Sequence, residues 1–194
     1  MEQVDSGYTE LRSYQWEMKH RLYEKWWGGS RSVMVQMPTG TGKTHLLASV
    51  ISDRMMADDT ASVWIVAHRR ELVEQIEETV ARYGISKDDG RVKVMSIQWL
   101  SKHWEDVKDE RPGLIVIDEA HHALAGTYRE LWLRYPNAKK LGTTATPCRL
   151  NRKGFTDLFD TLITSDSIAD FIRQGWLSAF DYVSIRPDSE DQRL

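Results

Sequence analysis

The sequence has little of what marks a secreted or membrane-bound protein. Cys148 is the only cysteine in 194 residues, so no disulfide can form within the chain. No stretch approaches the roughly 18 uncharged apolar residues of a membrane-spanning helix. The chain starts MEQVDSGYTE, which is acidic and polar where a secretory signal would be basic and then apolar. We therefore expect a cytoplasmic protein with no membrane partner.

An excess of positive charge is also missing. Lys and Arg together number 26 against 29 Asp and Glu, which gives a net charge of −3. Any contact with nucleic acid would therefore have to come from local basic patches. With 41% hydrophobic residues and the length of one ordinary domain, the chain can bury a sizeable core. Composition thus excludes the disordered and membrane classes but does not name a function.

Short apolar runs alternate with amphipathic helical patterns along the chain. The apolar runs predict buried strands at Val33–Met37, Val63–Ala67, Val92–Ser96, Leu114–Ile117 and Leu141–Thr144. Helical periodicity predicts helices at 11–26, 44–56, 71–83, 97–104 and 167–174, with one more helical stretch between 118 and 141. This alternation is typical of an α/β fold in which a parallel β-sheet is sandwiched between α-helices. A closing strand is expected at Phe180–Ile185.

The segment MPTGTGKT (37–44) lies between a predicted strand and a predicted helix, which is the context that a phosphate-binding loop requires. Gly40 and Gly42 allow backbone amides to curl around phosphate oxygens, Lys43 can reach the β- and γ-phosphates, and the Thr44 hydroxyl can bind Mg²⁺. Met37 stands where the general pattern begins with Gly. The alternative is a glycine-rich turn with a chance Gly-Lys-Thr, which the context disfavours. We assign a nucleoside triphosphate to the loop residues Pro38, Thr39, Gly40, Thr41, Gly42, Lys43 and Thr44.

An acidic segment, Asp118-Glu119-Ala120-His121-His122, directly follows the strand that ends at Ile117. Ligands of an open parallel sheet gather at the carboxyl ends of its strands, so this segment and the phosphate loop can face the same crevice. Asp118 is expected to hold Mg²⁺ through its water shell, and Glu119 to orient and deprotonate the attacking water. The predicted catalytic residues are thus Glu119, Asp118 and Lys43.

Two alternatives exist for the acidic segment. Asp118 and Glu119 could merely cap a helix by accepting hydrogen bonds from its first amides. A zinc site made of Glu119, His121 and His122 is weaker still, because adjacent histidines on a helix point about 100° apart.

A series of motifs occurs in a fixed order: LRSYQ (11–15), MPTGTGKT (37–44), VAHRRELVEQ (66–75), MSIQWL (95–100), VIDEAHH (116–122) and GTTATPCR (142–149). In this order they resemble the DEAH/DExH-box ATPases of helicase superfamily 2. The segment GFTDLFD and the following SIADFIRQGWLSAF look like the end of the first motor domain in the bacterial and phage branch, which includes the translocating subunits of restriction enzymes. The resemblance covers nearly the whole chain.

The resemblance implies a RecA-like P-loop NTPase domain over 1–185, followed by a polar tail, 186–194, that starts the linker to a second RecA-like domain. It also implies a helicase or duplex translocase that hydrolyses ATP with Mg²⁺ and binds nucleic acid, DNA more than RNA. In this family the second domain supplies arginine fingers, which contribute about 10³–10⁵ in rate to phosphoryl transfer. We therefore expect this chain alone to hydrolyse ATP weakly.

The resemblance also assigns individual residues. Gln15 would read the adenine base with Arg12 nearby, although Ser13 stands where the family usually has Pro. The nucleic-acid backbone would be contacted by His68, Arg69, Arg70, Ser96 and Gln98. The link between the nucleotide and the nucleic acid would involve His121, Thr144, Ala145 and Thr146.

Several alternatives remain at this point. Without the resemblance, Arg69 and Arg70 fit a solvated helix start better, and residues 144–146 fit a polar turn equally well. A non-catalytic ATP-sensing interaction module is the main competing function. It is disfavoured because Lys43, Thr44, Asp118 and Glu119 are all present. Another P-loop enzyme such as a kinase lacks support, since no lid or acceptor-site pattern occurs.

Overall fold

The computed structural model of this chain describes residues 11–85, 90–118, 125–145 and 158–178. Its strands are β1 (Ser32–Gln36), β2 (Val63–Ala67), β3 (Val92–Ser96), β4 (Leu114–Ile117), β5 (Lys139–Thr144) and β6 (Thr161–Thr164). Its helices are α1 (Ser13–Trp27), α2 (Lys43–Ala57), α3 (Arg70–Arg82), α4 (Ile97–Lys102), α5 (Ala125–Arg134) and α6 (Ile168–Arg173). Within these ranges no helix is both long and apolar enough to cross a membrane.

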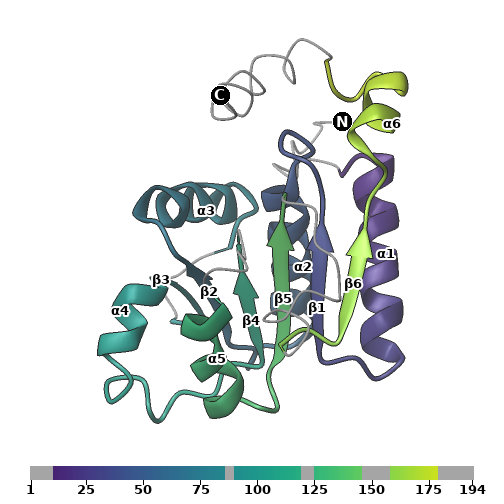
Figure 1. The fold of residues 1–194 in the computed structure, drawn as a ribbon. Helices are drawn as coiled ribbons and strands as arrows, with labels where there is room; N and C mark the ends of the chain where they lie inside the picture. Colours follow the sequence, from purple (N-terminus) through teal and green to yellow (C-terminus); the bar gives the residue numbers. More distant parts are fainter. Residues whose placement is uncertain (1–10, 86–89, 119–124, 146–157, 179–194) are drawn as a thin grey trace, which may run out of the picture.

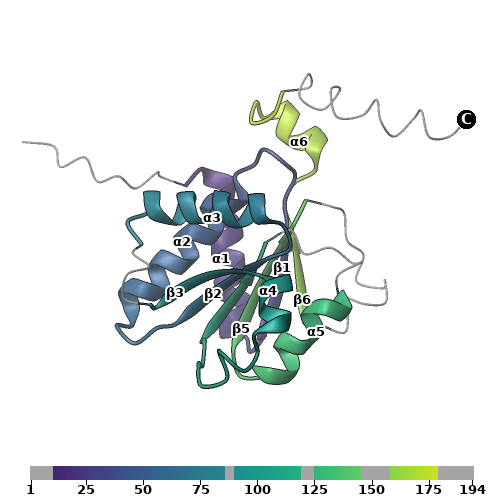
Figure 2. The same ribbon diagram turned by 90° about the vertical axis from the view of Figure 1, so that its left-hand side faces the viewer.

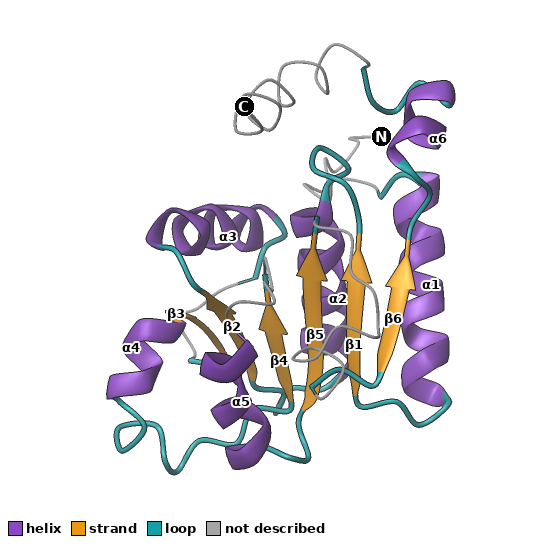
Figure 3. Ribbon diagram, in the orientation of Figure 1, coloured by secondary structure: helices purple, strands orange, loops and turns teal. Residues whose placement is uncertain are grey.

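The strands form one sheet in the order β3-β2-β4-β5-β1-β6, and every pair of neighbours is parallel (Figures 1 and 3). Each connection must therefore cross back from one end of the sheet to the other, and most of them do so through a helix. The predicted parallel α/β sheet is confirmed. One consequence matters most for function: the carboxyl ends of all the strands, with the loops that follow them, lie at the same edge of the sheet.

Helices cover both faces of the sheet, and each face has its own hydrophobic core (Figure 2). Alternate residues of one strand pack into opposite cores, because successive side chains of a strand point to opposite faces of the sheet. In β1, for example, Val33 and Val35 pack with α1, α2 and α3, whereas Met34 packs with the side of α4 and α5. Strands buried on both faces are mainly apolar, which is why β1, β2 and β4 were visible in the sequence.

The strand β6 was not predicted. It pairs with β1 at the edge of the sheet, with Val33 opposite Thr161 and Gln36 opposite Thr164. Its sequence is only Thr-Leu-Ile-Thr, too short and too polar at its ends to be noticed as a strand. Tertiary contacts fix it in place: the Ser32 hydroxyl donates to the carbonyl of Leu158 at 2.9 Å, and the amide of Asp160 donates to that hydroxyl at 2.9 Å. The strand predicted at Phe180–Ile185 lies outside the described residues.

Gly142 lies in the middle of β5, where the sheet meets the second core. A Cβ atom added there would lie 2.6 Å from Cζ of Phe159 and 3.1 Å from the sulfur of Met34. Phe159 is itself buried, so it has little room to move. A glycine is therefore required by packing at this position rather than by the backbone conformation.

Replacing Gly142 with Ala should lower the free energy of unfolding by about 1–3 kcal/mol, because the new methyl group overpacks the contact with Phe159. Gly126 in α5 is the matched control, since a Cβ atom there meets nothing within 4 Å. Gly126→Ala should instead raise stability by about 0.5–1 kcal/mol, as expected for a helical site. Urea unfolding of both variants is the measurement, and equal effects would contradict the packing described here.

Candidate nucleotide-binding site

The phosphate loop leaves β1 and enters α2, as the sequence predicts. Gly40 and Gly42 have φ angles of +86° and +77°, in the left-handed region that other residues rarely adopt. The Thr41 hydroxyl donates to the carbonyl of Pro38 at 2.6 Å and closes the turn between them. Because α2 begins at Lys43, its free amides and the positive end of its dipole face the space enclosed by the loop. Such a backbone concavity suits an anion.

The first turn of α1 holds this loop from one side. The Gln15 amide nitrogen donates to the carbonyls of Thr41 at 2.8 Å and Gly42 at 3.3 Å, and the Tyr14 hydroxyl donates to the same Thr41 carbonyl at 2.8 Å. A Cβ atom at Gly42 would lie only 2.3 Å from the Gln15 nitrogen, which gives a second reason for glycine there. The contribution of Tyr14 was missed, because an aromatic residue in a helical pattern is usually part of the core.

Arg12 and Gln15 lie beside the loop, as expected, but neither lines the cavity described next. The side-chain oxygen Oε1 of Gln15 accepts a hydrogen bond from the Arg12 backbone amide at 2.8 Å. In this structure the amide group of Gln15 thus contacts the protein itself. Its role as the reader of adenine stays a prediction.

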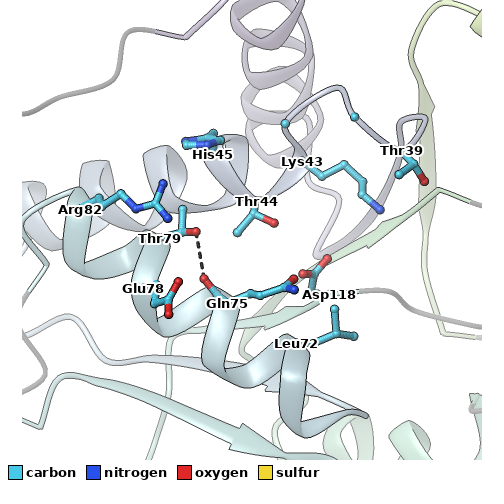
Figure 4. Close-up of a pocket in the computed structure, with 12 residues that line it drawn as sticks. Thr39, Lys43, Thr44, His45, Leu72, Gln75, Glu78, Thr79, Arg82 and Asp118 are labelled. Atoms are coloured by element: carbon cyan, nitrogen blue, oxygen red, sulfur yellow. Dashed lines mark hydrogen bonds between the residues drawn. The ribbon is translucent and has the colours of Figure 1, made fainter. Parts of the chain in front are cut away.

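A cavity of about 380 Å³ lies between the phosphate loop, the end of β4 and one face of α3. In Figure 4 the side chains of Lys43, Thr44 and Asp118 point into this shared space. The structure therefore brings together residues that are 75 positions apart in the sequence. The predicted residues that line the cavity are Thr39, Gly40, Gly42, Lys43, Thr44 and Asp118. Pro38 and Thr41 belong to the loop but do not line the cavity.

The far wall of the cavity comes from residues that sequence reasoning missed. These residues are His45 in α2 and Leu72, Gln75, Glu78, Thr79 and Arg82, which share one face of α3. The spacing of three and four residues along α3 was visible in the sequence. That this face lies against the phosphate loop depends on the packing of α3 on α2, which no local pattern shows.

Asp118 is 4% exposed at the end of β4, and its carboxylate is held by a neighbour. The Thr143 hydroxyl donates to Oδ1 of Asp118 at 2.7 Å. The partnership follows from register: β4 and β5 are parallel with Ile117 opposite Gly142, so the next residues of the two strands also adjoin. A buried carboxylate is costly unless hydrogen-bonded, and a hydrogen bond to a charged acceptor is among the stronger ones. Thr143 was not among the predicted residues.

Thr144, which was predicted to link the two ligand sites, lies fully buried at the end of β5. Its carbonyl accepts from the amide of Met37 at 3.0 Å, so the backbone of β5 is joined to the first residue of the phosphate-loop motif. Ala145 follows directly. Adjacent residues of β5 thus contact the acidic residue and the loop, while the coupling role of Thr144 and Ala145 stays a prediction. Glu119, His121 and Thr146 lie outside the described residues.

Basic and acidic side chains both line the cavity: Lys43 and Arg82 on the one hand, Glu78 and Asp118 on the other. Burial lowers the pKa of His45, and the positive charges of Arg82 and Arg12 lower it further. His45 is therefore neutral at neutral pH, because burial and the neighbouring guanidinium groups both disfavour its charged form. On the other side of the sheet, burial and the nearby Asp118 carboxylate raise the pKa of Tyr128, so this hydroxyl stays protonated.

The two predicted nucleic-acid elements lie side by side at the same edge of the sheet. They follow β2 and β3, which are parallel neighbours with Ala67 opposite Ser96. The Gln98 side chain donates to the carbonyl of His68 at 2.7 Å and joins the two loops. Arg69 caps α3 and is exposed, and the Arg70 side chain is 90% exposed with Glu74 at 3.3 Å. We call residues 68–70, 96 and 98 the β2–β3 edge.

In the described part of the chain, no group of three or more His, Cys, Asp or Glu is placed to hold a metal ion. The zinc alternative falls on residues 119–122, outside that part. The oxygen atoms of Thr44 and Asp118, which line one cavity, are hard ligands of the kind that magnesium prefers.

The family model described as Type III restriction enzyme, res subunit, matches residues 8–149. The chain belongs to this family. It is an N-terminal, RecA-like motor domain of helicase superfamily 2, of the type found in phages and bacteria. A relative in Saccharomyces cerevisiae is named as a putative ATP-dependent helicase, and the cavity at the phosphate loop is the candidate ATP site of this chain. The family resemblance seen in the sequence is confirmed.

Two relatives illustrate the similarity. A 51.5 kDa protein of a Lactococcus phage is 28% identical and covers 78% of this chain and 32% of that protein. The EcoAI endonuclease subunit of a type I restriction enzyme from Escherichia coli is 26% identical and covers 97% of this chain and 26% of that subunit. This chain thus spans about a third or less of the length of these relatives.

A solved structure shows the same fold. It is a nuclease-deletion mutant of the Type ISP restriction-modification enzyme LlaGI in complex with a DNA substrate mimic. The likeness has a TM-score of 0.67 at 14% identity, and it covers 92% of this chain and 22% of that one.

Replacing Lys43 with Ala should abolish measurable ATP binding, because the ammonium group neutralises phosphate charge that the backbone amides leave partly uncompensated. Lys25, exposed in the last turn of α1, is the matched control, and Lys25→Ala should bind ATP as the unaltered chain does. Calorimetric titration of the three proteins is the measurement. Equal affinity in Lys43→Ala would remove Lys43 from the ATP site.

Proposed function

We propose that this chain is the ATP-binding motor domain of a nucleic-acid-dependent ATPase, a helicase or duplex translocase. The observation that carries the proposal is the position of two sites at one edge of one sheet. The ATP cavity lies between the phosphate loop and Asp118, and α3, which lines its far wall, begins at Arg70 in the β2–β3 edge. A change at either site therefore has a short physical route to the other.

Within the cavity each residue has a task that its chemistry suits. The amides of the phosphate loop and Lys43 would hold the β- and γ-phosphates. The Thr44 hydroxyl and Asp118 would hold Mg²⁺, which would supply positive charge against the negative charge of the phosphates. Thr143 would keep the Asp118 carboxylate oriented toward that ion. Glu119, the next residue along the chain, would orient and deprotonate the attacking water.

The nucleic acid is proposed to be DNA rather than RNA, which the DNA substrate mimic in the LlaGI structure supports. Phosphate contacts carry no sequence information, so binding at the β2–β3 edge would tolerate any sequence. Its cations are few, and the chain as a whole carries a charge of −3. Affinity would therefore be modest and would weaken as the salt concentration rises.

A second RecA-like domain of the same protein is the proposed partner. It would cover the ATP cavity, supply arginine fingers and complete the nucleic-acid track. Hydrolysis at a useful rate would need that domain, with this one providing the loop, the metal ligands and the base. A non-catalytic sensor is not favoured, because such a module has no need of Lys43, Thr44, Asp118 and Glu119 together. A cytoplasmic location is part of the same proposal.

Replacing both Arg69 and Arg70 with Ala should reduce the salt slope of DNA binding by about one to two units, because each phosphate contact releases close to one counterion. The matched control is the double variant Arg129→Ala and Arg134→Ala, which removes the same charge from exposed positions of α5. Fluorescence anisotropy with labelled DNA at several salt concentrations gives both slopes.

The control variant should keep the slope of the unaltered chain. If the salt slope of DNA binding is unaltered in the Arg69/Arg70 variant, these arginines are solvated surface residues that do not contact phosphate. Failure of the unaltered chain to bind any DNA at low salt would contradict the proposed function itself.

A further inference from the structure

Trp99 is a large aromatic residue that the fold leaves open to solvent. It is 41% exposed in α4, although tryptophan is normally well buried. Its ring is stacked on His103, with 4.2 Å between the ring centres and 7° between the planes. Nδ1 of His103 lies 2.6 Å from the Trp99 carbonyl, which fixes the second ring on the first. The exposed indole therefore has a defined orientation before any ligand arrives.

Trp99 lines a groove of about 420 Å³ at the β3 edge of the sheet. In Figure 1 the strand β3 lies between α3 and α4, and the groove takes its lining from all three elements. The apolar part consists of Val73, Val94, Met95 and the indole of Trp99. The polar part consists of Arg70 and Ser96, both of which belong to the β2–β3 edge.

This lining has the chemistry of a nucleotide-binding groove. An aromatic face offers a base a stacking surface, and a guanidinium beside it offers a contact for the attached phosphate. The ion pair of Arg70 with Glu74 is exposed, and such pairs contribute little, so a phosphate can displace Glu74. Arg69 and Lys102 are also exposed on the helix ends that adjoin the groove, together with the acidic Glu71 and Glu74 of α3.

We propose that Trp99 is a stacking platform for an unpaired base of a nucleic-acid strand held at the β2–β3 edge, with Arg70 beside its phosphate. The inference rests on the proposed function and deepens it. In a duplex each base is covered by its neighbours and its partner, so a base enters this groove only from a single strand or after extrusion. The groove thus favours a single-stranded substrate and, with it, strand separation over translocation on an intact duplex.

The test compares an intact strand with one that lacks bases. The 194-residue chain and its Trp99→Ala variant are titrated at low salt with a labelled single-stranded DNA, the same strand with abasic sites, and the matching duplex. Loss of one base stack should weaken binding of the intact strand about 5- to 100-fold. Binding of the abasic strand should be the same for both proteins, and binding of the duplex should change little.

Control variants separate stacking from structure. Trp27, which is 77% exposed at the end of α1, provides the matched control, and Trp27→Ala should bind all three probes as the unaltered chain does. Trp99→Phe keeps an aromatic face and should retain most of the affinity. Trp99→Leu keeps the groove apolar without a ring system, and it should lose affinity for the intact strand as Trp99→Ala does.

The outcomes are distinguishable. Equal losses on the intact and abasic strands would mean that Trp99 acts through the structure of the edge, and the inference would be overturned. Unchanged binding in Trp99→Ala and Trp99→Leu, with salt-dependent binding by the unaltered chain, would also overturn it while leaving the proposed function intact. If the unaltered chain binds none of the probes, the proposed function fails and the inference fails with it.

Discussion

The hydrogen bond from Thr143 to Asp118 is the contact on which the account of this site depends. It joins the ends of two central strands, β4 and β5, at the carboxyl edge of an all-parallel sheet. The next strand in the sheet is β1, which leads into the phosphate loop. The backbone amide of Met37 in that loop donates a hydrogen bond to the carbonyl of Thr144. The neighbouring strands β4, β5 and β1 thus position the Asp118 carboxylate, the Thr143 hydroxyl and the start of the phosphate loop. A site built on strand ends in this way is organised before its ligand binds.

Two helices pack on either side of the phosphate loop at this edge. α1 fixes the phosphate loop through Gln15 and Tyr14, and α3 forms the opposite wall of the cavity. Because α3 begins at Arg70, the same helix belongs to the candidate ATP cavity and to the β2–β3 edge. Gln98, which contacts the carbonyl of His68, ties the next strand into that edge. The fold therefore links the two proposed binding surfaces through packed secondary structure.

Features that depend on neighbouring residues in the sequence could be predicted from it. Strands buried on both faces are mainly apolar, and glycines at left-handed positions mark the phosphate loop, so both could be predicted. The strand β6 could not, because four residues with polar ends carry no clear period. Thr143 and the α3 wall, with Gln75 and Arg82, escaped because they depend on strand register and helix packing. Trp99 has an ordinary helical spacing in the sequence. Its exposure beside a groove is visible only in the structure.

The Mg²⁺ dependence of ATP affinity tests the central claim, that Asp118 held by Thr143 faces the phosphates beside Lys43 and Thr44. ATP binding should be measured with Mg²⁺ and with a chelator for the unaltered chain, Thr143→Val and Thr143→Ser. We expect Mg²⁺ to strengthen binding to the unaltered chain and to Thr143→Ser. In Thr143→Val this gain should fall by about 10- to 100-fold, as is usual when a metal ligand loses its supporting hydrogen bond, while binding without the metal stays the same. A full Mg²⁺ gain in Thr143→Val would contradict the account, because the contact between Thr143 and Asp118 would then have no part in the ATP site.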